Sequence, residues 1–349
     1  MSDYYDGTKL LSLTDINGNR PELYLLTGNR TAGKTTYFAR YLVNAFIKRG
    51  EQFMLLYRYN YELDNIPGKF FSDIRELFFP DYNMTAISRA KGVYHELYLA
   101  KAGEDPQLCG FATALNKADQ IKKYAHVFNH VRRMMFDEFQ PETGQYVADE
   151  VRKFQSIHTS VARGQGQHTR YVPVYMISNA VTLINPYFTR LKISGRLKAD
   201  TKFLKGPGYV MEQSFNDAAA AAIKLSGFAQ AFADDKYMEY ATQNVYLHDS
   251  QAFIEKPAGM NKYLATIRYE GKDYAIRQYT DAGVIYCDDK PDMSFAYRIA
   301  VTTEDHQVNY VMLRTNEMFI ATMRYFFNQG CFRFKNLECK DAVMQLLSY

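Results

Sequence analysis

A glycine-rich turn near the start of the chain constrains the fold more than any other feature. Residues 28–35 read GNRTAGKT, which fits the pattern G-x4-G-K-[ST] in full. The preceding residues 22–27 (ELYLLT) predict a short buried strand, and residues 34–49 predict a helix with one apolar face. A strand, a glycine turn and a helix in this order form the context in which backbone N–H groups hold phosphate. The sequence therefore predicts a P-loop domain.

The same turn provides candidate ligands for a nucleotide and its metal ion. Lys34 is expected to reach the β- and γ-phosphates, and the Thr35 hydroxyl is expected to bind Mg²⁺. ATP and Mg²⁺ are therefore the expected cofactors. A glycine-rich turn that carries a lysine by chance is the alternative, and the flanking strand and helix argue against it. The residues expected to contact the nucleotide in this turn are Gly28, Asn29, Arg30, Thr31, Ala32, Gly33, Lys34, Thr35 and Thr36.

A second strand-like run, VRRMMF, ends in two acids, Asp137 and Glu138. Asp137 is expected to bind Mg²⁺ through water, and Glu138 is expected to polarise the attacking water as general base. A GTPase is disfavoured, because the acids begin DEFQ rather than D-x-x-G and the N-K-x-D match at 116–119 precedes this strand. A small-molecule kinase has no use for a hydrolytic glutamate. The acids therefore predict an additional-strand ATPase whose hydrolysis drives movement.

Three further groups of polar residues are candidates for supporting roles. Ser178 and Asn179 lie at the end of the strand VYMISNA, where a motor ATPase places a polar side chain beside the γ-phosphate. An ordinary strand-end turn is the alternative. Arg163, followed by Arg170, is a candidate for a guanidinium supplied to a neighbouring subunit, against a solvated helix end. Residues 190–205 hold six basic residues and one acid, which suits either a phosphate backbone or a solvated face.

The pattern of elements changes after GPG at 206–208, which predicts more than one domain. Residues 1–205 alternate strands and helices, among them a helix expected at about 146–163, and predict an α/β ATPase domain with a parallel sheet. Residues 206–240 include an alanine-rich helix and predict a helical linker or lid. Residues 241–349 predict a smaller α+β domain that opens with three closely spaced strands.

Composition excludes several classes of protein. The chain has 349 residues and is 47% hydrophobic, so it can bury a sizeable core. No apolar run approaches the roughly 20 residues that span a bilayer, and the start lacks a signal-peptide pattern, so no membrane partner is expected. Four scattered cysteines predict reduced thiols in a cytoplasm. A net charge of +4 permits contact with nucleic acid without requiring it.

With these features in view, the sequence resembles the DNA-packaging ATPases of phi-29-like small tailed phages. The stretches GNRTAGKTTY, GEQFMLLYRYNYEL, MMFDEF, SNAVTLINPYF and DSQAFIEK occur in that family's order. The resemblance implies a P-loop domain of the FtsK/HerA-like branch, a small linker and a C-terminal vestigial RNase H-like domain that binds nucleic acid. It also implies a homomeric ring, pentameric in the family, on the portal (connector) of a prohead. Such a ring drives double-stranded DNA and in some relatives docks on a packaging RNA.

The resemblance also assigns roles to individual residues. Lys34 and Thr35 take the Walker A roles, Asp137 the metal role and Glu138 the catalytic role. Arg163, in SVAR, falls where the family places its trans-acting arginine finger. The catalytic candidates are therefore Glu138, Arg163 and Lys34, the metal ligands are Thr35 and Asp137, and Asn179 joins the nucleotide-binding residues.

Three positions depart from the family pattern or leave a choice open. Lys122 or Lys123 falls near a lysine that the family directs at nucleotide in trans. Asn60 stands where the family has a DNA-gripping lysine, and Lys69 is one substitute. The strand KYLATIRY lacks the central acid that a two-metal nuclease needs, so the C-terminal domain is expected to bind nucleic acid without cutting it.

The sequence therefore predicts a viral genome-packaging motor. Its expected location is the host cytoplasm and, transiently, the portal vertex of the prohead, and not the mature virion. Two alternatives remain open. One is a large terminase with an active nuclease, and the other is a DNA-binding or assembly protein that uses ATP only as a switch.

Overall fold

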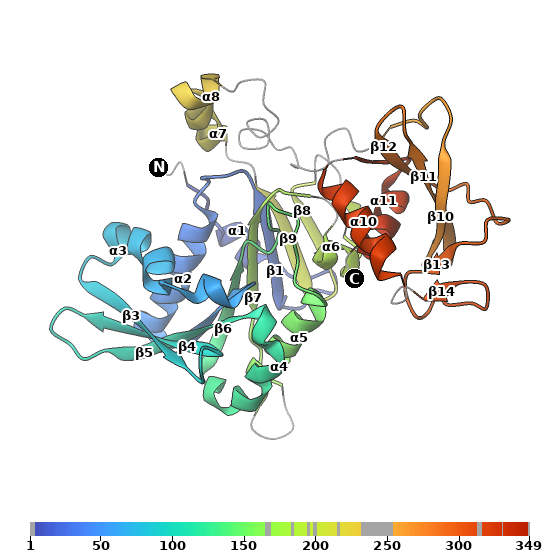
Figure 1. The fold of residues 1–349 in the computed structure, drawn as a ribbon. Helices are drawn as coiled ribbons and strands as arrows, with labels where there is room; N and C mark the ends of the chain where they lie inside the picture. Colours follow the sequence, from blue (N-terminus) through green and yellow to red (C-terminus); the bar gives the residue numbers. More distant parts are fainter. Residues whose placement is uncertain are drawn as a thin grey trace. The chain divides into compact units, whose positions relative to one another are not determined.

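The computed structural model contains two compact units (Figure 1). The first comprises Met1–Ala180 and Ala199–Asn244, and the second comprises Val181–Lys198 and Val245–Tyr349. The residues that the structure describes are 4–164, 169–182, 185–193, 196–197, 201–214, 217–231, 254–312, 316–329 and 331–347. Among the helices of these residues, none is long and apolar enough to cross a lipid bilayer.

The first unit is built on a nine-stranded sheet with the order β3-β4-β5-β2-β6-β7-β1-β9-β8. The six strands from β5 to β9 are parallel, and antiparallel strands extend the sheet at both edges. The strand bounds are β1 (Leu23–Gly28), β2 (Gln52–Tyr57), β3 (Tyr82–Arg89), β4 (Tyr94–Lys101), β5 (Gln107–Ala114), β6 (Val131–Asp137), β7 (Val174–Asn179), β8 (Phe203–Gly206) and β9 (Tyr209–Ser214). The strand β7 lies between β1, which leads into the glycine turn, and β6, which ends in the acid pair. This inserted strand is the one that the additional-strand class requires.

Helices cover both faces of this sheet, as Figure 1 shows for α2 and α5. On β6, Met135 belongs to the core cluster that contains Phe38 of α2, whereas its neighbour Phe136 stacks on Phe154 of α5. Because successive strand residues point to opposite faces, α2 and α5 lie on opposite sides of the sheet. The helices of this unit are α1 (Thr8–Ser12), α2 (Lys34–Arg49), α3 (Ser72–Phe78), α4 (Ala118–Ile121), α5 (Glu150–Val161), α7 (Asp217–Lys224) and α8 (Gly227–Ala231). The tighter or wider turns are η1 (Asn60–Leu63), η2 (Pro67–Phe71), η3 (Leu115–Lys117) and η4 (Lys122–Phe128).

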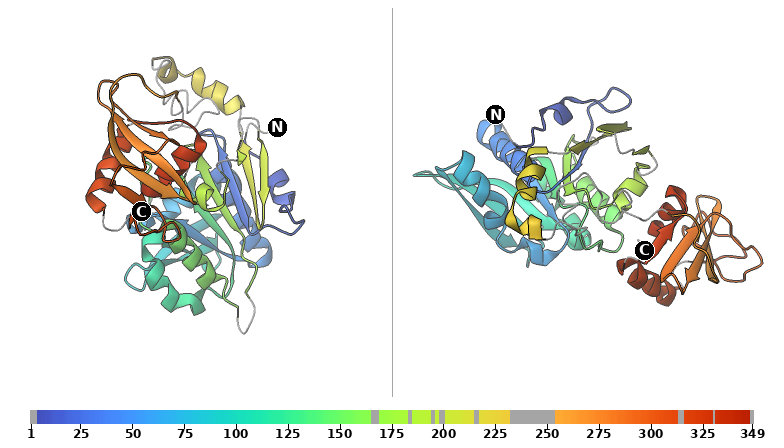
Figure 2. Two further views of the ribbon diagram at one scale, coloured as in Figure 1. Left: turned by 90° about the vertical axis from the view of Figure 1, so that its right-hand side faces the viewer. Right: turned by 90° about the horizontal axis from the view of Figure 1, so that it is seen from above.

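The second unit has its own six-stranded sheet, with the order β14-β13-β10-β11-β12-β15. The antiparallel meander β10-β11-β12 is flanked by parallel partners on both sides. The helices α10 and α11 cover one face of this sheet, as Figure 2 shows, and a separate apolar cluster fills the space between them. The bounds are α6 (Pro186–Arg190), β10 (Lys262–Tyr269), β11 (Lys272–Tyr279), β12 (Val284–Asp288), β13 (Arg298–Ala300), β14 (Val311–Met312), α10 (Glu317–Asn328), β15 (Phe332–Phe334) and α11 (Leu337–Leu347).

The observed elements agree closely with the sequence expectations, with three differences. The helix expected from residue 146 begins at Glu150. The alanine-rich stretch 214–232, which was expected to form one helix, contains two short helices, α7 and α8, which Leu225 and Ser226 separate. The strand β9 extends the first sheet beyond residue 205, where the ATPase domain was expected to end. The division into three functional domains stays a prediction.

Candidate nucleotide site

The glycine turn joins the carboxyl end of β1 to the N-terminus of α2. Gly33, the N-cap of α2, has φ 81° and ψ 16°, a left-handed conformation that glycine adopts without strain. Position 28 requires a glycine because β9 approaches closely: a Cβ at this position would lie 2.0 Å from the backbone oxygen of Ser214. The turn therefore wraps tightly around the end of β1 and leads directly into α2. A helix N-terminus in this position is suited to bind phosphate.

Lys34 lies in the floor of this site and is only 5% exposed. Its Nζ donates to the backbone oxygen of Asn29 (2.5 Å) and to Oδ1 of Asn179 (3.3 Å). Burial lowers the pKa of Lys34 to about 8, whereas nearby Asp137 acts in the opposite direction. An anion beside the ammonium group would restore its full charge. The ammonium group of Lys34 is therefore suited to bind a polyphosphate.

Asp137 is the last residue of β6 and Glu138 follows it, at the edge of the sheet that carries the turn. Burial raises the pKa of Asp137 to about 6, the Glu138 carboxylate adds to this shift, and a hydrogen bond from Thr35 opposes it. The pairing of Thr35 with Asp137 brings a hydroxyl and a carboxylate oxygen together, which is the donor chemistry that Mg²⁺ prefers. Glu138 is exposed and has φ 55°, and its backbone N–H donates to Oδ1 of Asp137 (3.0 Å). The two acids are therefore adjacent but differ in environment.

A chain of polar contacts connects the turn to the strand end of β7. Arg30 Nη1 lies 3.3 Å from Oε1 of Glu142, and the same oxygen accepts a hydrogen bond from Nδ2 of Asn179 (3.4 Å). Asn179 in turn contacts Lys34 through its Oδ1. Ser178 is buried, and its Oγ has no hydrogen-bond partner among the described residues. Asn179 is thus the residue of the pair that touches the phosphate-binding lysine.

Most of the predicted residues line one pocket of about 350 Å³ in the first unit, whereas Gly28 and Asn29 of the turn are not part of its lining. This volume is in the range of small-ligand sites. A second cavity, of about 280 Å³, shares Thr35, Asp137 and Glu138 with it and is bounded by Arg58 and Lys69, among others. The first pocket is lined by Tyr4, Arg30, Thr31, Ala32, Gly33, Lys34, Thr35, Thr36, Asp137, Glu138, Ile177, Ser178 and Asn179.

Arg58 and Glu150 form a buried ion pair that the sequence did not reveal. Arg58 Nε and Nη2 contact the two carboxylate oxygens of Glu150 at 2.9 and 3.0 Å, and both residues are less than 5% exposed. The guanidinium also donates to the backbone oxygens of Glu138 (3.1 Å) and Phe139 (3.0 Å). This pair fixes the backbone that carries Glu138. The only hint in the sequence is a charged residue directly after the buried strand β2.

The two arginines near the end of α5 differ in environment. The Arg170 guanidinium donates to the backbone oxygens of Val131 (2.8 Å), Phe128 (3.2 Å) and Val161, and burial lowers its pKa. Arg163 is exposed and lies outside the lining of the nucleotide pocket of its own subunit. Arg170 therefore has a structural role, because its guanidinium links the end of α5 to the segment before β6 through backbone oxygens. Of these two arginines, Arg163 is the one accessible to a neighbouring molecule.

The remaining basic candidates lie outside the first pocket. Lys122 is exposed and pairs with Asp119 (3.3 Å), and Lys123 is exposed, so the choice between the two lysines stays open. Lys69 borders the second cavity, and its Nζ donates to the backbone oxygen of Glu62 (3.2 Å). Parts of the quoted motifs and of the basic segment 190–205 fall outside the described residues, namely 183–184, 194–195, 198–200 and 249–253.

The fold and the site define a P-loop protein of the additional-strand class. In this class a third strand, here β7, separates the strand that leads into the Walker A turn from the strand that ends in the acid pair. Within that class, the chain belongs to the family of podovirus DNA encapsidation proteins (Gp16), whose model matches residues 1–348. The resemblance identified from the sequence is therefore confirmed, as is the expectation of a viral DNA-packaging protein.

Similar proteins cover nearly the whole chain. The DNA packaging protein of Bacillus phage phi29 is 26% identical over 347 residues, which are 98% of this chain and 96% of that protein. The DNA packaging protein of Bacillus phage B103 is 26% identical over 331 residues, 94% of this chain and 95% of that protein.

Two solved structures share the fold. One is the bacteriophage Phi-29 viral genome packaging motor assembly, with a TM-score of 0.58, 24% identity, and coverage of 99% of this chain and 98% of that chain. The other is the Phi-28 gp11 DNA packaging motor, with a TM-score of 0.61, 16% identity, and coverage of 100% and 99%. The α/β fold class predicted from the sequence is therefore confirmed.

Proposed function

We propose that this chain is the ATPase of a viral genome-packaging motor, which hydrolyses ATP to move double-stranded DNA into a prohead. The observation that carries the proposal is the convergence of Lys34, Thr35, Asp137 and Glu138 on one pocket. A protein that only bound ATP would need the turn but would have no use for a second acid beside the metal ligand. The proposal therefore favours a hydrolytic motor over a nucleotide switch.

The phosphate chain is held by the turn and by Lys34. Backbone N–H groups at the start of α2 face the β-phosphate, and the Lys34 ammonium stabilises the charge that develops on the transferred phosphoryl group. Thr35 and Asp137 would hold Mg²⁺, which supplies charge neutralisation to the phosphates when bound. Asn179, which contacts Lys34 and Glu142, is placed to respond when the terminal phosphate is lost.

Glu138 acts on the attacking water. Its carboxylate accepts a proton from the water as the oxygen attacks the γ-phosphorus, and the bond to the ADP leaving group breaks in line. Arg58 donates to the backbone oxygen of Glu138 and so holds the backbone that carries this carboxylate. Arg163 is proposed to complete the site of a neighbouring subunit, where its guanidinium stabilises the transition-state charge.

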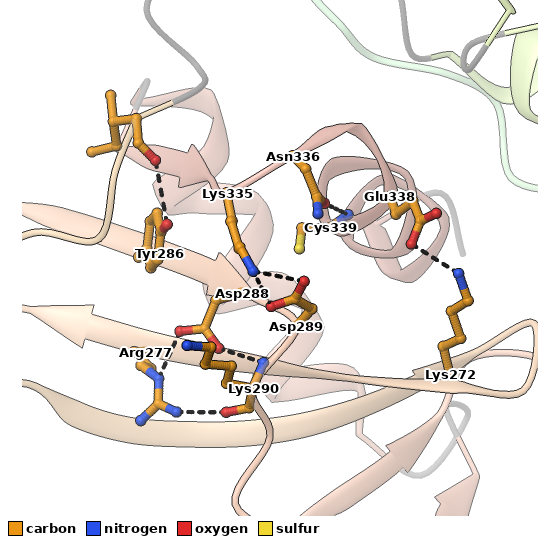
Figure 3. A network of polar contacts seen from close by, with 11 residues as sticks. Lys272, Arg277, Tyr286, Asp288, Asp289, Lys290, Lys335, Asn336, Glu338 and Cys339 are labelled. Carbon is orange, nitrogen blue, oxygen red and sulfur yellow. Dashed lines mark hydrogen bonds and ion pairs between the residues drawn. The ribbon is translucent and has the colours of Figure 1, made fainter.

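The second unit is proposed to bind nucleic acid without cutting it. Thr266, in the middle of β10, is fully buried, and it pairs in register with Arg298 of β13, where a two-metal nuclease needs acids. Two neighbouring acids at the end of β12 are committed to ion pairs: Asp288 with Arg277 (3.0 Å) and Asp289 with Lys335 (2.5 Å), as Figure 3 shows. These acids are therefore neutralised by cations rather than grouped around a metal site.

The proposed assembly is a homomeric ring, with five subunits, on the portal of a prohead. Its support is the family assignment and the two similar motor structures. A packaging RNA is a further proposed partner. The proposed location is the host cytoplasm and, during packaging, the portal vertex, with the protein absent from the mature virion.

The proposal is tested by separating ATP binding from ATP hydrolysis. Glu138→Gln keeps the size and hydrogen-bonding capacity of the side chain but removes the base. We expect this variant to bind ATP as the wild type does and to lose turnover by at least about a hundredfold, the usual scale of general-base catalysis. Unchanged turnover would rule out Glu138 as the base.

The nuclease alternative is tested on the wild-type protein. Incubation with DNA and Mn²⁺ is expected to leave the DNA intact. Cutting that disappears in an Asp288→Asn, Asp289→Asn double variant would establish an active terminase nuclease and contradict the proposal.

A further inference from the structure

Tyr4 is an aromatic side chain at the edge of the nucleotide pocket. It is 65% exposed, although it belongs to the pocket lining. Among the described residues of that lining it is the single aromatic side chain, whereas the glycine turn and the acid pair provide groups suited to phosphate and metal. A nucleoside needs an apolar, flat wall in addition to these groups. Tyr4 is the residue that can provide such a wall.

The Tyr4 ring lies directly against the glycine turn. A Cβ added to Gly33 would lie 2.9 Å from Cδ1 of Tyr4 and 3.3 Å from its Cβ, so the ring contacts the N-cap of α2. The phosphates occupy the turn and the N-terminus of this helix. Because Tyr4 packs on the last residue of the turn and lines the same pocket, its ring is within reach of a nucleoside that extends from phosphates bound there.

The backbone next to Tyr4 is firmly attached to the rest of the unit. The Tyr5 N–H donates to the backbone oxygen of Ala32 in the turn (2.8 Å), and its hydroxyl donates to Oε2 of buried Glu212 (2.7 Å). The Tyr5 ring is 8% exposed and packs edge-on against Tyr37 of α2 (5.6 Å between centroids). The backbone that carries Tyr4 is therefore anchored beside the turn through its neighbour Tyr5.

We infer that Tyr4 forms one wall of the base subsite, on which the planar base of the nucleotide stacks. The inference rests on the proposed function, because it requires the pocket to bind a nucleoside triphosphate. Stacking on an aromatic ring tolerates every base, since each base has a π-face. Tyr4 thus adds affinity for the nucleoside part of the ligand rather than selection among the bases.

The test compares a ligand that carries the base with one that does not. Binding of ADP and of inorganic pyrophosphate, neither of which an ATPase hydrolyses, is measured on full-length wild type, Tyr4→Ala and Tyr4→Phe. Tyr4→Ala is expected to weaken ADP binding about tenfold, the scale of one base–aromatic stack, and to leave pyrophosphate binding unchanged. Tyr4→Phe retains the ring and is expected to bind ADP as the wild type does.

The outcomes separate this inference from the proposed function. An equal loss for ADP and pyrophosphate in Tyr4→Ala, or no loss for ADP, overturns the base subsite while the ATP site stands. A wild-type protein that binds neither ligand contradicts the ATP site and, with it, the base subsite.

The absence of tryptophan from the chain provides a second readout. Tyr4→Trp introduces a single indole, whose fluorescence should change when ADP binds and stay constant with pyrophosphate. Tyr61→Trp is the matched control, because Tyr61 is 68% exposed and lies outside the lining of both cavities at the site. Equal responses of the two variants to ADP would contradict stacking at Tyr4.

Discussion

The buried ion pair of Arg58 and Glu150 allows a quantitative test of how the catalytic loop is held. Glu150→Leu replaces the carboxylate by an apolar group of similar size and leaves the Arg58 charge without its buried partner. The side chains of Arg58 and Glu150 are 5% and 1% exposed, so water can do little to solvate the Arg58 charge once the carboxylate is removed. Breaking a buried pair in this way typically costs about 3–5 kcal/mol of unfolding free energy. For a unit of this size that corresponds to a fall in Tm of about 10 °C.

The double variant Arg58→Met, Glu150→Leu separates stability from positioning. A buried apolar pair often matches or exceeds the stability of the ion pair that it replaces, so most of the lost Tm should return. The backbone oxygens of Glu138 and Phe139 nevertheless lose their guanidinium donor. ATP turnover should therefore stay low in the double variant although its fold is restored. Thermal unfolding and steady-state ATPase assays on the same preparations provide both quantities.

Two results would refute this reasoning. A fall of less than about 1 kcal/mol for Glu150→Leu would show that the Arg58 charge is compensated elsewhere. Full recovery of turnover together with stability in the double variant would show that the pair contributes to the fold but does not position Glu138.

Three further predictions address the finger, the turn and a buried lysine. Mixing Arg163→Ala subunits with Glu138→Gln subunits should restore part of the ATPase activity that each lacks alone, and no recovery at any ratio would exclude a role in trans. Gly28→Ala should abolish nucleotide binding, because its Cβ would lie 2.0 Å from the backbone oxygen of Ser214. Gly227→Ala is the control: its Cβ would meet open space, so this variant should bind nucleotide normally. Equal nucleotide binding by both variants would contradict the close approach at Gly28. Burial lowers the pKa of Lys340 to about 7, so unfolding takes up a proton between pH 7 and about 10.5 and this lysine destabilises the fold most at the lower end. Lys340→Met should therefore raise the free energy of unfolding more at pH 7 than at pH 10, with a difference between the two increases of at most about 5 kcal/mol. Equal increases at both pH values would be evidence against that burial.

The sequence predicts those parts of the site that depend on short stretches of chain. The turn with Lys34 and Thr35 is a local motif, and Asp137 and Glu138 end a strand that its own composition identifies. The three strands of the C-terminal meander are likewise separated by short turns. In each case the local pattern fixes the structure, so the expectation and the observed element agree.

The contacts that the sequence missed join distant residues. Arg58 and Glu150 are 92 positions apart, and Arg30 and Glu142 are 112 apart, so no spacing rule connects them. Arg58 follows β2 and Glu150 lies beyond β6, and these two strands are adjacent in the sheet although β3, β4 and β5 intervene in the chain. Arg30 follows β1 and Glu142 lies beyond β6, and only β7 separates these strands in the sheet. Side-chain partners across a parallel sheet follow from its strand order, which periodicity alone does not determine.

The family resemblance singled out Arg163 from the sequence, whereas the structure shows how Arg163 and Arg170 differ physically. Both arginines flank the same glycine-bearing stretch of sequence, GQGQHT. Only the backbone oxygens of Phe128, Val131 and Val161 around Arg170 distinguish a structural arginine from an accessible one.

The most direct test of the central claim is DNA packaging by the Glu138→Gln variant. Proheads, double-stranded DNA, ATP and either wild-type or variant protein are combined, and the DNA that becomes protected from nuclease is measured, with and without RNase pretreatment of the proheads. We expect wild-type protein to protect full-length DNA in an ATP-dependent manner and Glu138→Gln to protect none, although it still binds ATP. Normal packaging by Glu138→Gln would contradict a motor that runs on hydrolysis at this site.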